Sequence, residues 1–143
     1  MGMKRLLVMM MAAVVSFSLM ADDVVFKNRA LGDALALQMK KPTGEFFPPP
    51  KFTKAELAKV TELHLTDIKI TDEDLKSLST KVQNLEVFSL QLIKVTDAGL
   101  KEVAKLRKLR GLYLTNSKVT DAVIKEVIKL RHLAQIGLGG TFI

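Results

Sequence analysis

The chain has 143 residues, a formal net charge of +7 and no cysteine. This length corresponds to a single domain, and the lack of cysteine excludes disulfides and a lipid anchor attached through cysteine. The charge excess is mild, and the basic stretch lacks the interleaved aromatic residues that stack on bases, so we expect no nucleic-acid partner.

The first 21 residues have the features of a secretory signal peptide. Lys4 and Arg5 precede an uncharged apolar stretch, residues 6–21, and two aspartates follow it. A positive start, an apolar middle and a small residue at the boundary are typical of such peptides. The alternative is an uncleaved anchor, but the apolar stretch is shorter than the roughly 20 residues that a spanning helix needs. We expect cleavage after Ala21, a secreted or periplasmic protein, and no stable membrane anchor after cleavage.

Residues 22–59 differ in pattern from the rest of the chain, and we expect them to form an N-terminal cap. A helix is expected within residues 29–41, before a segment rich in proline. Thr53 and Glu56 have the spacing of a capping box, which predicts a second, short helix. A phenylalanine cluster is expected to cover the first repeat: Phe46, Phe47 and Phe52. Alternatively, the run of two phenylalanines and three prolines is a ligand for an aromatic-lined groove.

From residue 60 onward, one pattern recurs every 24 or 25 residues. Its first half is a run of apolar residues, and the units begin at Val60, Leu85, Leu109 and Leu133. The second half is a short phrase: Ile70-Thr71-Asp72, Val95-Thr96-Asp97 and Val119-Thr120-Asp121. A period of this length predicts a solenoid.

Each unit reads as one strand followed by one short helix. In the first half, apolar residues two apart face one side of a strand. In the second half, the threonine is a typical helix N-cap and the aspartate suits the positive end of the helix dipole. Apolar residues three apart then follow on one helix face: Leu75 and Leu78, Leu100 and Val103, Ile124 and Val127.

On these motifs, about residues 53–143 resemble the leucine-rich-repeat family, in the bacterial variety with a V-T-D-x-x-L second half. The resemblance implies an α/β solenoid, with a short parallel sheet on the concave side and short helices on the convex side. One departure is that the usual asparagine or cysteine of the turn is replaced: Ile68, Ile93, Ser117 and Thr141. The turns must therefore satisfy their backbone groups in another way.

The resemblance also implies a non-catalytic protein that binds another protein through the concave face. Side chains between the apolar strand positions form columns on that face: Glu62, Val87, Gly111 and Gln135; His64, Ser89, Tyr113 and Gly137; Thr66, Gln91, Thr115 and Gly139. We expect His64, Ser89 and Tyr113 to form its centre, since tyrosine is enriched at binding hot spots. The alternative is that these are ordinary exposed strand residues.

Two other binding functions remain open. Lysines and arginines cluster around the helical halves, and this basic convex face would suit a cell-wall or other anionic surface polymer. In addition, the last unit stops at Ile143 with no polar cap, and an open strand edge invites pairing with another chain. The protein would then self-associate, or the chain would be a shortened form of a longer parent.

We expect no catalytic, metal or cofactor site. His64 and Ser89 could mimic a base and a nucleophile, but no acid is placed to orient the histidine. The recurring aspartates lie one to a coil, so they do not converge as calcium ligands must.

Overall fold

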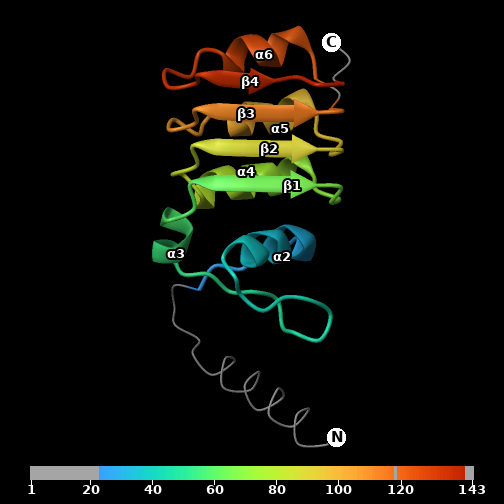
Figure 1. The fold of residues 1–143 in the computed structure, drawn as a ribbon, viewed down its shortest axis with the longest axis vertical. Coiled ribbons are helices and arrows are strands. Elements are labelled where there is room, and N and C mark those ends of the chain that lie inside the picture. Colours follow the sequence, from blue (N-terminus) through green and yellow to red (C-terminus); the bar gives the residue numbers. More distant parts are fainter. Residues whose placement is uncertain (1–22, 118, 141–143) are drawn as a thin grey trace, which may run out of the picture.

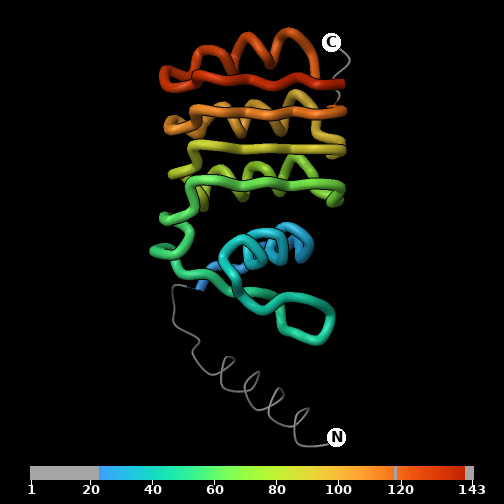
Figure 2. The backbone as a smooth tube through the Cα atoms, viewed as in Figure 1, coloured from blue at the N-terminus to red at the C-terminus, as the bar shows by residue number. Residues whose placement is uncertain are grey.

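The computed structural model describes residues 23–117 and 119–140, so the predicted signal peptide lies outside the described residues. Successive coils of the chain are stacked along one axis (Figure 2). Four strands form a single parallel sheet in chain order: β1 (Glu62–Thr66), β2 (Val87–Gln91), β3 (Gly111–Thr115) and β4 (Gln135–Gly137).

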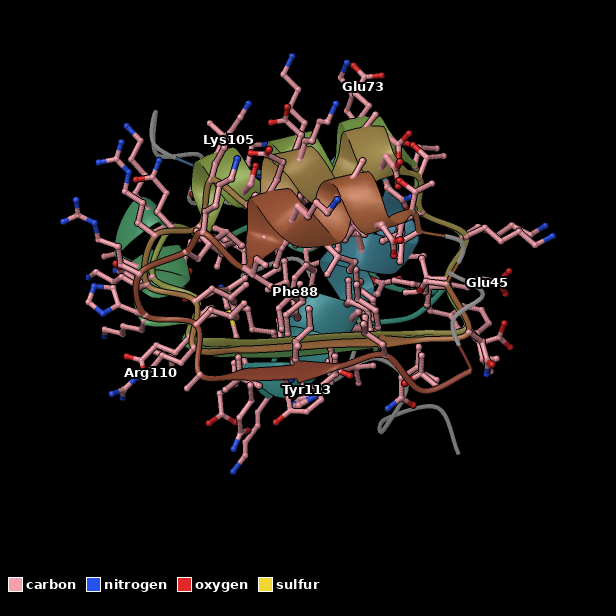
Figure 3. All side chains as sticks on the ribbon, turned by 90° about the horizontal axis from the view of Figure 1, so that it is seen from above. Glu45, Glu73, Phe88, Lys105, Arg110 and Tyr113 are labelled. Atoms are coloured by element: carbon pink, nitrogen blue, oxygen red, sulfur yellow. The ribbon has the colours of Figure 1, made fainter. Side chains whose placement is uncertain are left out.

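One helix follows each of the first three strands and packs on the same face of the sheet (Figure 1). These helices are α4 (Asp72–Lys81), α5 (Asp97–Val103) and α6 (Asp121–Val127). Seen along the stacking axis, Phe88 points from the sheet toward the helices, whereas Tyr113 lies on the opposite face (Figure 3). The predicted α/β solenoid, with a parallel sheet on one side and short helices on the other, is confirmed.

The core lies between the sheet and the helices and is continuous from one repeat to the next. Its strand residues are Leu63, Leu65, Phe88, Leu90, Leu112 and Leu114, and its helix residues are Leu75, Leu78, Leu100, Val103, Val123 and Val127. The last repeat helix differs in which residues it buries most deeply. In α6, Val123 and Val127 are buried, whereas Ile124 is half-buried and packs against the edge of the core.

Threonine precedes every repeat helix and caps two of them. Thr71 and Asp74 form a complete capping box at the start of α4. Thr96 accepts a hydrogen bond from a backbone N–H of α5. Thr120 makes no cap of this kind, since its hydroxyl donates to Asp97 at 2.5 Å instead.

Asp72 and Asp97 also hold the next repeat, which the sequence analysis did not predict. The Asp72 carboxylate accepts from the backbone N–H of Thr96 at 3.2 Å and from its hydroxyl at 2.7 Å. Asp97 accepts the same two bonds from Thr120, at 3.0 and 2.5 Å. The carboxylates of Asp72 and Asp97 are thus each hydrogen-bonded to the neighbouring coil.

Backbone bonds satisfy the turns that lack the usual asparagine. Just after the strands, the N–H groups of Asp67, Leu92 and Asn116 donate to the carbonyls of Gln91, Thr115 and Gly139 in the next repeat. A weaker side-chain bond joins the Ser117 hydroxyl to the Ile93 carbonyl at 3.4 Å. The coils are therefore tied together mainly by main-chain groups at this edge.

The segment before β1 contains two helices, α2 (Arg29–Gln38) and α3 (Lys54–Ala58), and α2 contacts β1. Thr53 and Glu56 form the predicted capping box of α3. Phe52 is fully buried and meets Phe26 edge to face, with ring centroids 5.9 Å apart. The prediction for Phe46 is wrong, because this side chain is 97% exposed. Among the described residues, no helix is both long and apolar enough to cross a membrane.

Candidate functional site

The outer face of the sheet, on the side opposite the helices, is the candidate binding surface. The strand register pairs the same residues that the repeat alignment placed in columns, from Glu62 opposite Val87 to Tyr113 opposite Gly137. Because strand side chains alternate between the two faces, the predicted set lies on the outer face: Glu62, His64, Thr66, Val87, Ser89, Gln91, Tyr113, Thr115 and Gln135.

These residues differ in how far they reach solvent. Glu62, His64, Thr66, Gln91 and Gln135 are exposed, and Val87, Tyr113 and Thr115 are half-buried. Ser89 is only 3% exposed, so the expectation that it helps form the centre of the face is wrong. Its side chain is short, and the register places it between the larger side chains of His64 and Tyr113.

Tyr113 lies against the sheet instead of projecting from it. A Cβ atom added to Gly137 would come within 2.7 Å of Tyr113 Cδ1, and one added to Gly111 within 3.3 Å of Cε2. The ring therefore occupies the space above both glycines. Its hydroxyl donates to Gln135 Oε1 at 2.5 Å, which holds the far end of the ring.

Gly111 and Gly137 have a structural role that the sequence analysis did not predict. Their part is to leave room for the tyrosine ring, in the way that an aromatic side chain covers glycine on a sheet. The sequence did contain an indication of this role, because Gly137 follows Tyr113 in the same column and Gly111 stands in the adjacent column. Tyr113 thus covers the last strand at Gly137.

Nothing in this part of the molecule resembles a catalytic constellation. His64 lies on β1, whereas His132 lies in the turn before β4. Among the described residues, no group of three or more His, Asp or Glu side chains could hold a metal ion. The exposed polar groups of the sheet are instead spread over a broad face.

Comparison with known proteins identifies the architecture. Neither a protein-family model nor a curated protein matches the sequence. Among solved structures, an internalin from Listeria monocytogenes matches with a TM-score of 0.59 and 22% identity, over 82% of this chain and 31% of that chain. Internalin C2 of the same organism matches with a TM-score of 0.57 and 20% identity, over 85% of this chain and 61% of that one.

Internalins are leucine-rich-repeat proteins. This chain has a leucine-rich-repeat fold. The chain spans less than two thirds of either internalin, so the likeness concerns the repeats and not a whole internalin. Within the leucine-rich-repeat frame, the outer face of the sheet is a surface on which each repeat presents side chains at equivalent positions.

Proposed function

We propose that this leucine-rich-repeat protein is an exported, non-catalytic binding protein that recognises another protein through the outer face of its sheet. The observation that carries the proposal is the Tyr113 ring, seated on Gly111 and Gly137 and held by Gln135. The remaining exposed side chains around it supply hydrogen-bonding groups of several kinds.

A seated tyrosine favours binding for an entropic reason. A side chain that is already fixed before the partner arrives loses little conformational freedom on association. Tyrosine also offers a large apolar ring and a polar end, which is why it is common at the centres of interfaces. The sheet beneath it is held by backbone bonds between every pair of neighbouring strands, so the surface keeps its shape.

The test is capture of a protein partner by the immobilised chain, followed by measurement of affinity for that partner. We expect Tyr113→Ala to weaken binding by about 10- to 30-fold, as for a hot-spot residue worth about 2 kcal/mol. Gly137→Ala should also weaken binding, because its Cβ displaces the ring without removing it. Ile128→Ala is the matched control, since Ile128 is 57% exposed but lies outside the sheet. Equal binding by all four proteins would refute the sheet face as the site.

Export is supported by the composition of residues 1–21 and is tested separately. We expect the protein recovered outside the cytoplasm to begin at Asp22. An intact N-terminus on that protein, or its retention in the cytoplasm, would remove this part of the proposal and leave the sheet face untouched.

Self-association is a second candidate function, and one exposed residue favours it. Ile136 on β4 is 36% exposed, whereas Phe88 and Leu112, at the same position on the preceding strands, are fully buried. A second copy of the chain that packed against β4 would bury the Ile136 side chain. Light scattering across a concentration series tests this idea with Ile136→Lys as the comparison. A mass that rises with concentration only in the unaltered protein would support it, and a constant mass would exclude it.

A further inference from the structure

Positive side chains gather along one edge of the solenoid, where each helix leads into the next strand. We define the basic edge as Lys105, Arg107, Lys108, Arg110, Lys129 and Arg131. In the view along the stacking axis, Lys105 and Arg110 lie on the same side of the molecule, far from Glu45 (Figure 3). The arginines recur at matching repeat positions, since Arg107 and Arg131 are one 24-residue unit apart.

Helix stabilisation does not account for the basic edge. Cations near a helix C-terminus are favourable, but this effect falls off beyond the last turn. Lys101 and Lys125 occupy the last turns of α5 and α6 and suffice for that purpose. Arg107 and Arg131 lie four residues beyond the last residues of these helices, Val103 and Val127.

Among the described residues, four side chains of the basic edge have partners within the protein, whereas Arg107 and Arg131 do not. Lys105 pairs with Glu102 and Lys129 with Glu126, both at 2.7 Å on the exposed surface. Arg110 lies 3.8 Å from Glu86, and Lys108 donates to the side-chain oxygen of Asn84 at 2.8 Å. Within residues 23–117 and 119–140, neither Arg107 nor Arg131 has an ion pair or a side-chain hydrogen bond.

Two adjacent hollows lie along the same edge. The first is lined by Gln83, Asn84, Ala104, Lys105, Arg107 and Lys108. The second is lined by Ala104, Arg107, Lys129, Leu130, Arg131 and His132. Ala104 and Arg107 line both hollows, so the two hollows adjoin one another. Together they offer a path from coil to coil with cationic groups on its walls.

We propose that the basic edge binds a linear polymer of phosphodiesters that lies along the stacking axis. An arginine guanidinium donates two parallel hydrogen bonds to a phosphate, and neighbouring strands place equivalent residues about 4.8 Å apart. A flexible chain that carries a phosphate on each unit can therefore meet successive cationic turns. Nucleic acid fits less well, because the residues that line the two hollows include no Phe, Tyr or Trp ring on which a base could stack.

The test measures binding of the full chain to synthetic poly(glycerol phosphate). We expect this polymer to bind, glycerol 1-phosphate to bind far more weakly, and affinity for the polymer to fall steeply as salt concentration rises. Arg107→Gln with Arg131→Gln should weaken polymer binding by about tenfold and flatten its salt dependence. Both side chains are exposed and unpaired in the described structure, so the unfolding temperature should not change.

A matched control removes the same charge elsewhere. Lys76→Gln with Lys94→Gln neutralises two exposed lysines outside the basic edge and should leave polymer binding unchanged. Tyr113→Ala should do the same, which separates this proposal from the protein-binding face. The proposal is overturned if the polymer does not bind, if the lysine pair matters as much as the arginine pair, or if phosphatidylglycerol vesicles or single-stranded DNA bind more tightly than the polymer.

Discussion

At the scale of single residues, the position just after each strand imposes an unusual backbone conformation. Asp67, Leu92 and Asn116 have φ values of 50°, 56° and 55°, in the left-handed region. Aspartate and asparagine tolerate this region better than other residues with a side chain. Leu92 does not share this tolerance, and its side chain is 54% exposed, so it gains little from burial.

Leu92→Asn should therefore stabilise the protein. We expect the free energy of unfolding to rise by about 0.5–1 kcal/mol, because asparagine adopts the left-handed conformation at lower cost. Denaturation by urea measures the change. Leu92→Val is the control and should destabilise the protein, since a β-branched residue is least suited to positive φ. If the asparagine variant were no more stable than the valine variant, backbone strain at this position would be ruled out.

The residue scale is also where sequence reasoning was least complete. The alternation of strand residues placed Ser89 and Tyr113 on the outer face, but alternation says nothing about how side chains of different size cover one another. Ser89 is buried because it is small and has larger neighbours in the adjacent strands. The position of the Tyr113 ring depends on two neighbouring glycines that leave room for it. This position can be worked out only when the strand register is known.

At the scale of elements, the contact between α4 and α5 depends on a glycine. A Cβ atom added to Gly99 would come within 2.8 Å of Leu75 Cδ1 and still closer to a carboxylate oxygen of Asp72. That carboxylate already accepts two hydrogen bonds from Thr96. Asp72 therefore takes part both in the close approach of the two helices and in the hydrogen bonds between their repeats.

Gly99→Ala should destabilise the protein even though alanine is the better helix former. Alanine in place of glycine favours an isolated helix by about 1 kcal/mol, but overpacking costs roughly 1–3 kcal/mol and the Asp72 bonds must also distort. We expect a net loss of about 1–2 kcal/mol in the free energy of unfolding.

A double-mutant cycle with Asp72→Ala identifies the cause of that loss. With the carboxylate already absent, Gly99→Ala should cost less, because one of the two clashing groups is gone. An equal cost in both backgrounds would show that Asp72 takes no part in the effect.

At the scale of the whole molecule, several carboxylates make the stability depend on pH. The Thr120 hydroxyl and N–H lower the pKa of Asp97 below its ordinary value of 3.8. A hydrogen bond from Lys41 is the main cause that lowers the pKa of Glu56 below 4.5. A carboxyl group with a lowered pKa in the folded state adds stability above its unfolded pKa, and this stability is lost as the pH falls through the folded pKa.

The free energy of unfolding should therefore be nearly constant from about pH 7 to about pH 5 and should fall below about pH 4. Denaturation by urea across this range provides the measurement. Asp97→Asn should be less stable at neutral pH by about a few tenths of a kcal/mol, since the group lies near the surface. The free energy of unfolding of this variant should also fall less on acidification than that of the original protein. If the variant and the original protein had identical pH profiles, Asp97 would not contribute to the acid response.

The repeating part of the fold could be predicted from the sequence because one pattern, repeated, determines both elements of a coil. Thr71 and Thr96 mark helix starts, apolar residues two apart mark the buried face of each strand, and the alignment of the units gives the strand register. The segment before β1 has no such repetition, so the exposed position of Phe46 and the burial of Phe52 depend on how that segment happens to close over β1. The bonds between coils were missed because they join residues a full repeat apart.

The bond from aspartate to the next threonine always runs in one direction along the chain. The unit that holds Thr96 and Asp97 therefore offers an acceptor to its successor and a donor to its predecessor. A unit copied and inserted beside its original would find the complementary group on both sides. The array can accordingly be lengthened or shortened by whole units while its connections are preserved, whereas a gain or loss of part of a unit would leave a carboxylate and a threonine facing the wrong neighbours.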